Sequence, residues 1–296
     1  MKKKRIPTKE SAQFFLLAAP VLVLFVVFVV WPFLGGIFYS LTRWDGIAPT
    51  FQFVGLDNFR TLFQDFYVTR PMIQTFIYAF LITIFQNVLS LIMALALNQK
   101  LRTKGLLRTL WFIPVVIAPL IVGYIWSFLF TNPIAQMGKA LGIEEMANNL
   151  LGSRHTALYA GVFVSIWRSA GYTMVIYIAA FQNIPLEIYE AAQVDGARGW
   201  RRFWKVTFPL IAPAFTINMV LTMERGFKEF DMMFTLTNGG PGNSSELISL
   251  TIYRETFEHF RAGYGSAMGV VLFMIIAVLS LAELYFLRRK EEDIVY

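Results

Sequence analysis

The sequence is poor in the residues that build catalytic and metal sites. Its 296 residues include no cysteine and only two histidines, His155 and His259. The absence of cysteine excludes a disulfide framework, thiol catalysis and thiolate metal sites, although it does not identify the compartment. Neither histidine belongs to an HExxH pair or to another metal-ligand spacing. The sequence therefore predicts no catalytic residue and no metal site, and an intramembrane enzyme is a distant alternative.

Charged residues are scarce as well. Only 15% of the chain is Asp, Glu, Lys or Arg, whereas about 25% is usual in a soluble domain. The net charge of +7 could suit a nucleic-acid partner, but 56% of the residues are hydrophobic, and in so apolar a chain the place of each charge matters more than the total. We therefore expect membrane lipid, and no nucleic acid, as a partner.

A phosphate-binding loop is also missing. No segment matches GxxxxGK[ST], so the chain has no such cradle for ATP. Any ATP hydrolysis that drives this protein must therefore take place on another polypeptide.

Six apolar segments are each long enough to cross a membrane, which takes roughly 20 helical residues. They are residues 13–40, 72–97, 110–130, 157–182, 209–230 and 265–287, approximately. The first exceeds the roughly 7–15 apolar residues of a signal peptide, so we expect it to remain as a span. The predicted fold class is an all-α integral membrane protein with six transmembrane helices, between an N-terminal segment, 1–12, and a tail, 288–296. Pro114, Pro119 and Pro213 are expected to kink their helices.

The distribution of Lys and Arg predicts the orientation. The N-terminus, the tail and the loops after the second and fourth spans hold 16 of these residues, against 7 in the other three loops. Because Lys and Arg favour the cytoplasmic side in short loops, both termini are expected in the cytoplasm.

The segment EAAQVDGARGWRRFWKVTFPL, residues 190–210, lies in the cytoplasmic loop between spans four and five. Pro185 suits the first turn of a helix and Gly196 suits its end, so residues 186–195 are expected to form a short helix. Aromatic and basic residues then alternate between residues 198 and 205, which is typical of a stretch at the headgroup level. On the residues alone, this loop could equally be an interfacial anchor that joins two spans.

The same segment resembles the cytoplasmic signature of binding-protein-dependent ABC importer permeases, EAA, three residues, G, nine residues, I, one residue, L and P. Glu190, Ala191, Ala192, Gly196 and Pro209 meet it, while Val206 and Phe208 replace the I and the L. The stretches FVGLDNFRTLF, FKEFD and LTNGGPG resemble the carbohydrate-uptake branch, akin to the larger maltose-transporter permease subunit, although the extra N-terminal spans and the large insertion of that subunit are not found here.

The resemblance implies a mechanism and a set of partners. The helix before Gly196 would be a coupling helix docked on a separate ATPase, with Glu190, Ala191, Ala192, Asp195 and Gly196 as its coupling residues. It implies a second homologous permease subunit, two ATPase subunits that use ATP and Mg, and an extracytoplasmic sugar-binding protein. This chain would bind no cofactor, and the complex would lie in a bacterial plasma (inner) membrane.

Two groups of polar residues inside spans mark a possible substrate pathway, because such residues usually face a bundle interior or a wet cavity. Each group recurs at i, i+3, i+4 and i+7, and matching the flanking motifs places both opposite sugar-contacting positions of the maltose permease. The groups are Ser165, Arg168, Ser169 and Tyr172, and Thr222, Arg225, Gly226 and Glu229. Gly226 is expected to leave room for the sugar.

Alternatives remain for these residues and for the substrate. The pairs Glu224 with Lys228 and Arg225 with Glu229 could neutralise each other at i, i+4 spacing, and Arg168 could be architectural. The resemblance predicts import of a carbohydrate, such as an oligosaccharide. Arg168 and Arg225 would also suit an anionic substrate such as a uronate-containing oligosaccharide or glycerol phosphate. An ion-coupled secondary transporter is the alternative from another class, and the coupling-helix signature argues against it.

Overall fold

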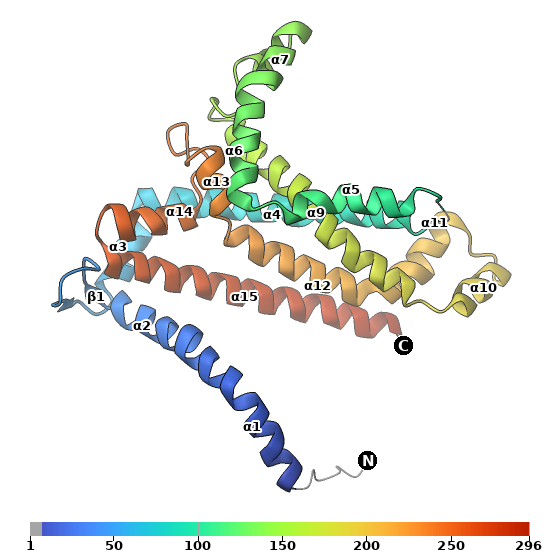
Figure 1. The fold of residues 1–296 in the computed structure, drawn as a ribbon, viewed down its shortest axis with the longest axis horizontal. Coiled ribbons are helices and arrows are strands. Elements are labelled where there is room, and N and C mark those ends of the chain that lie inside the picture. Colours follow the sequence, from blue (N-terminus) through green and yellow to red (C-terminus); the bar gives the residue numbers. More distant parts are fainter. Residues whose placement is uncertain (1–7, 100, 296) are drawn as a thin grey trace. The chain divides into compact units, whose positions relative to one another are not determined.

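The structure, a computed structural model, describes residues 8–99 and 101–295, and these are largely helical (Figure 1). The basic residues Lys2, Lys3, Lys4, Arg5 and Lys100, which contribute to the predicted orientation, lie outside the described residues.

The described chain consists of α-helices, single π-helical turns and two short strands. The α-helices are α1 (Thr8–Phe25), α2 (Trp31–Ser40), α3 (Asp57–Gln64), α4 (Phe66–Leu97), α5 (Lys104–Val116), α6 (Pro119–Leu129), α7 (Ala135–Leu141), α8 (Glu144–Ala147), α9 (Ala157–Gln182), α10 (Leu186–Val194), α11 (Gly199–Arg202), α12 (Phe208–Phe227), α13 (Asp231–Leu236), α14 (Ile248–Tyr253) and α15 (Ala262–Val295). Single turns of π-helix are η1 (Val26–Val30), η2 (Phe130–Ile134), η3 (Phe203–Thr207) and η4 (Arg254–Glu258). Two short strands, β1 (Thr42–Arg43) and β2 (Gln52–Phe53), pair in antiparallel fashion.

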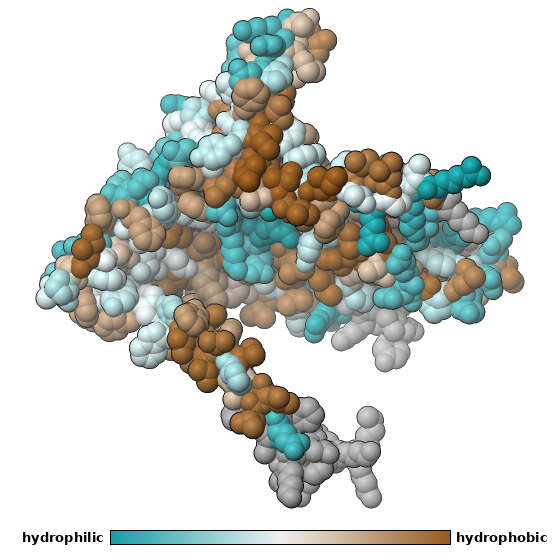
Figure 2. All heavy atoms as spheres, viewed as in Figure 1, coloured by the Kyte–Doolittle hydropathy of each residue, from teal (hydrophilic) through white to brown (hydrophobic). Residues whose placement is uncertain are grey.

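Six helical segments are long and apolar enough to cross a membrane, as predicted. They are Leu16–Ser40, Phe66–Leu97, Pro119–Leu141, Ala157–Gln182, Gly199–Phe227 and Ala262–Arg289. Many large apolar side chains on these segments are exposed, and Figure 2 shows them along α2 and α6. Such surfaces suit contact with lipid or with another apolar chain, because water does not solvate them favourably.

The third span differs from the predicted residues 110–130. Helix α5 ends at Val116, Ile117 and Ala118 are non-helical with ψ 132° and 138°, and α6 begins at Pro119. The residue before a proline is pushed away from helical geometry, and the proline ring suits the first turn of the next helix. Pro119 therefore separates two helices rather than kinking one, and the crossing segment begins there.

The chain forms two compact units. Unit 1 contains the described residues up to Gln64 together with Ile252–Val271, and unit 2 contains Asp65–Thr251 and the chain from Leu272 onwards. In unit 2, α4 packs along both α9 and α12, and α13 packs on α6. Its buried apolar core includes Tyr78, Ile82, Met174, Ile178 and Ile211.

Candidate functional site

Helix α10 is short because both of its ends are set by local sequence. Pro185 lies at its N-cap with φ −56°. At the other end, the Gly196 N–H donates to the Gln193 carbonyl at 3.1 Å and the Ala197 N–H donates to the Ala192 carbonyl at 2.8 Å. Gly196 has φ +74°, so these bonds form a Schellman motif in the conformation that glycine adopts most easily. The predicted helix before Gly196 is present.

One face of α10 is exposed in the described chain. Glu187, Glu190, Ala191 and Val194 are exposed at i, i+3, i+4 and i+7, and Val194 is 88% exposed. Ala192 lies on the opposite face and is only 5% exposed. The exposed face of α10 is therefore acidic at one end and apolar at the other, and it contains Val194 but not Ala192.

The basic and aromatic stretch after α10 is divided between the core and the surface. Phe203 is buried, whereas Trp200 and Trp204 are exposed. The Arg202 guanidinium carbon lies 5.5 Å from the centre of the Tyr189 ring, which links η3 and α11 to α10 through a cation–π contact. This contact joins α10 to the helical segment that leads into α12.

A network of neutral polar side chains joins α4, α9 and α12 within unit 2. The Gln86 Nε2 donates to Thr173 Oγ1 at 2.7 Å, and the Tyr177 hydroxyl donates to Asn87 Oδ1 at 2.8 Å. The Asn87 Nδ2 in turn donates to Thr222 Oγ1 at 3.3 Å. These side chains are buried, and their partners lie on neighbouring helices, which suits a structural role in a membrane bundle.

A second polar group is charged, and we call Arg168, Tyr172, Arg225 and Glu229 the charged cluster. The Arg225 guanidinium carbon lies 5.2 Å from the centre of the Tyr172 ring. Glu229 is 9% exposed, accepts a hydrogen bond from the Met232 N–H at 3.3 Å, and interacts electrostatically with Arg168 and Arg225. Two cations and one anion therefore lie together beside an aromatic ring.

Arg168 also contacts the break between α5 and α6. Its Nε donates to the Ile117 carbonyl at 3.4 Å, where the extended backbone leaves that carbonyl outside a helix. This contact is of the kind expected for the architectural alternative that the sequence left open for Arg168. The remaining N–H groups of the guanidinium can still serve another ligand, because arginine has five donors.

The model of the family described as binding-protein-dependent transport system inner membrane component matches residues 86–291. The chain belongs to this family. It is accordingly the multi-pass membrane component of a transport system that depends on a binding protein, and its relatives are permease subunits rather than enzymes.

Relatives in this family match along almost the whole chain. The probable starch degradation products transport system permease protein AmyD of Thermoanaerobacterium thermosulfurigenes is 36% identical, with 99% of this chain and 100% of that protein covered. The multiple sugar-binding transport system permease protein MsmF of Streptococcus mutans is 33% identical, with 91% and 93% covered. The sn-glycerol-3-phosphate transport system permease protein UgpA of Escherichia coli, strain UTI89, is also 33% identical, with 93% and 94% covered.

A solved structure has the same fold. A chain of the crystal structure of a bacterial alginate ABC transporter, in complex with an alginate pentasaccharide-bound periplasmic protein, superposes with a TM-score of 0.82. The two chains are 22% identical, and 96% of each is covered. The six-span permease fold predicted from the sequence is therefore confirmed.

The structure separates the residues of the predicted substrate pathway into two environments. The charged cluster contains four of them, Arg168, Tyr172, Arg225 and Glu229. Ser165 lies near the Tyr78 hydroxyl, which also interacts electrostatically with Arg168 and Glu229. Ser169 and Thr222 are buried among α4, α9 and α12. Tyr78 was not predicted, because a tyrosine in an apolar span carries no signal of its neighbours.

Gly226 does not leave room for a sugar, contrary to the prediction. A Cβ added there would lie 2.7 Å from the Ala79 Cα and 2.7 Å from Ile82 Cδ1. Glycine is required because α12 and α4 approach each other closely at this point. The missing side chain accommodates helix α4.

Proposed function

We propose that this chain is the permease subunit of an ATP-driven ABC importer that moves a carbohydrate, in particular an oligosaccharide, into the cytoplasm. The observation that carries the proposal is the 36% identity, over nearly the full length, to a permease named for starch degradation products. The similarity to a permease of a multiple-sugar system supports the same substrate class.

An anionic substrate is the rival, and the relative named for sn-glycerol 3-phosphate supports it. The environment of the two arginines argues against it. The guanidinium of Arg225 lies over the Tyr172 ring, Arg168 donates to a backbone carbonyl, and the Glu229 carboxylate lies near both. Because Glu229 offsets one of the two positive charges and both guanidinium groups already have other contacts, a neutral polyhydroxylated ligand suits the cluster better than a phosphate.

In this proposal α10 is the coupling helix. Glu187, Glu190, Ala191 and Val194 would enter a cleft of a separate ATPase, with Asp195 and Gly196 at the end of the helix. Closure of two ATPase subunits around ATP and Mg would move α10, and the Tyr189–Arg202 contact would pass that motion towards α12. This chain itself would bind no cofactor.

The proposed substrate pathway consists of Ser165, Arg168, Tyr172, Arg225 and Glu229, with Tyr78 added. Ser169, Thr222 and Gly226 would support it from the helix contacts. Hydroxyl, guanidinium and carboxylate groups provide the donors and acceptors that sugar hydroxyls need, and the Tyr172 ring offers an apolar face.

The assembly would contain a second homologous permease, two ATPases and an extracytoplasmic sugar-binding protein in a bacterial plasma membrane. Both termini, residues 1–12 and 288–296, would be cytoplasmic. The loops 41–71, 131–156 and 231–264 would then face the binding protein, and residues 186–205 would face the ATPase.

Uptake by the reconstituted complex tests the proposal. Proteoliposomes containing both permeases and both ATPases, with the binding protein added outside, would be given labelled maltotriose, a uronate trisaccharide or glycerol 3-phosphate. We expect uptake of maltotriose that depends on ATP. ATP-dependent uptake of only the two acidic substrates, abolished by Arg168→Ala, would establish the anionic rival. Uptake that needs an ion gradient and no ATP would establish a secondary transporter.

A further inference from the structure

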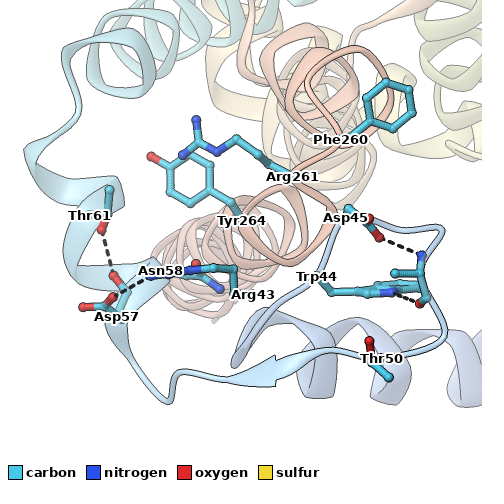
Figure 3. A pocket seen from close by; sticks show the side chains of 11 residues that line it. Arg43, Trp44, Asp45, Thr50, Asp57, Asn58, Thr61, Phe260, Arg261 and Tyr264 are labelled. Carbon is cyan, nitrogen blue, oxygen red and sulfur yellow. Dashed lines mark hydrogen bonds and ion pairs between the residues drawn. The ribbon is translucent and has the colours of Figure 1, made fainter.

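We propose that unit 1 contains a second carbohydrate subsite, at the face predicted to lie outside the membrane. The subsite is a cavity of about 480 Å³ formed entirely by residues of unit 1 (Figure 3). Its volume falls within the range of roughly 300–1,000 Å³ typical of small-molecule sites. The inference rests on the proposed function, because it assumes that an oligosaccharide arrives at this face.

Three segments that are distant in the sequence form the walls of the cavity. They are the turn after β1, helix α3, and the residues around the start of α15. The Asn58 Nδ2 of α3 donates to the Ser40 and Thr42 carbonyls, at 2.8 Å each. The Gly263 N–H of α15 donates to the Trp44 carbonyl at 3.0 Å. The walls are therefore joined by hydrogen bonds before any ligand binds.

Arg261 is fixed at one side of the cavity. Its Nη1 lies 2.9 Å from Glu255 Oε2, and its guanidinium carbon lies 4.2 Å from the centre of the Tyr264 ring. Glu255 and Tyr264 are both buried, so the arginine is held between a carboxylate and an aromatic face. The contact with Glu255 involves only part of the guanidinium fork, which leaves donors for a ligand.

The turn after β1 is also held by several contacts. Trp44 stacks on Tyr39, with ring centres 4.3 Å apart, and its Nε1 donates to the Ala48 carbonyl at 2.8 Å. Asp45 Oδ1 accepts from the Ala48 N–H at 2.8 Å and the Ile47 N–H at 2.9 Å. These backbone donors lower the pKa of Asp45, so this wall carries a full negative charge at neutral pH.

The chemistry of the lining favours a neutral sugar over an anion. Arg43 and Arg261 are balanced by Asp45 and Asp57, and Arg43 Nη2 lies 3.9 Å from Asp57 Oδ2. An anion would gain little net attraction and would face two carboxylates. A sugar hydroxyl both donates and accepts, so it can use the carboxylates and the guanidinium groups together.

Photoaffinity labelling can locate the subsite. A diazirine derivative of maltotriose would be added to the assembled complex in proteoliposomes, without the binding protein, and labelled peptides would be identified by mass spectrometry. We expect labels within residues 43–61 and 260–264, removed by excess maltotriose and retained in excess uronate trisaccharide. Thr50→Trp, which fills the cavity, should lower this labelling about tenfold. Ile47→Trp, which adds the same ring at an exposed neighbour outside the cavity, should leave it unchanged.

A second pair of variants, which removes side-chain atoms and adds none, separates loss of binding from misfolding. Arg43→Ala should also reduce labelling, whereas Arg60→Ala on α3, which does not line the cavity, should not. Absence of competed labels at these residues, or equal labelling in Thr50→Trp, would overturn the subsite. If Thr50→Trp leaves labelling intact and instead stops cross-linking to the binding protein, the cavity holds a protein segment and not a sugar, and the subsite is again overturned. Failure of the proposed function would be seen differently, as an absence of ATP-driven maltotriose uptake by the wild-type complex.

Discussion

Two groups of polar side chains lie in the same unit and are partnered in different ways. The neutral network of Gln86, Asn87, Thr173 and Tyr177 is buried, and its side chains form hydrogen bonds with one another across adjacent helices. The charged cluster of Arg168, Tyr172, Arg225 and Glu229 has an unequal number of cations and anions, and the Tyr172 ring is partly exposed. We therefore expect the neutral network to hold helices together and the charged cluster to face a ligand.

The largest expected effect comes from separating the helices that hold the neutral network. Gly226→Leu would place side-chain atoms within the backbone of α4, because even a Cβ would lie 2.7 Å from the Ala79 Cα. We expect destabilisation by about 3 kcal/mol or more, seen as loss of monodisperse protein in detergent chromatography. Gly105→Leu is the matched control, since a Cβ there meets nothing within 4 Å. A Gly226→Leu protein with the wild-type Tm would contradict the close α4–α12 contact.

Removing a charge from the cluster should affect transport more than stability. Arg225→Ala should lower the kcat/KM of sugar uptake about 10- to 100-fold, the loss expected for a hydrogen bond to a charged group. The Tm should change little, because Arg225 is partly exposed. Lys228→Ala is the control on the same helix end, since Lys228 pairs with Glu224 at the surface. Equal uptake by the two variants would remove the charged cluster from the substrate pathway.

A change within the neutral network should affect stability more than transport. Asn87→Leu leaves the Tyr177 hydroxyl and Thr222 Oγ1 without this partner. We expect a loss of about 1 kcal/mol, typical of a hydrogen bond between membrane helices, measured as a lower Tm. The KM for sugar should stay unchanged. A raised KM with an unchanged Tm would instead place Asn87 on the substrate pathway.

The smallest effect is expected for a charge pair outside both groups. Glu224→Gln removes the ion pair with Lys228, in which both side chains are exposed. Such pairs contribute about 0.5 kcal/mol or less, so Tm and uptake should both remain close to wild type. A large loss of uptake would show that the charged cluster extends to this turn of α12.

The sequence was sufficient for the number of spans and for helix α10. Long apolar segments, Pro185 and Gly196 act locally, and the structure has six spans and a short helix that ends before Gly196. The break at Pro119 was expected only as a kink, because the sequence does not show whether a neighbouring side chain will satisfy the freed carbonyl. Arg168, 51 residues further along the chain, does so.

The contacts between helices could not be predicted in the same way. Helical spacing grouped Thr222 with Arg225, Gly226 and Glu229, but it did not show that Thr222 and Gly226 face α4. For α10, the sequence signature marked Ala192, whereas Val194 is exposed on the face with Glu190. Periodicity defines the faces of one helix, and only packing determines which face is covered.

ATP-driven maltotriose uptake by a Glu190→Lys, Gly196→Pro double variant tests the proposed coupling role of α10 most directly. Proline cannot adopt the φ of +74° at residue 196, and lysine reverses the charge of the exposed face. The variant should insert into the membrane, yet uptake by the complete complex should fall to the level seen without ATP. Glu144→Lys, on the short helix α8 of a predicted outer loop, should retain wild-type uptake. Wild-type uptake by the double variant would contradict the assignment of α10 as the coupling helix.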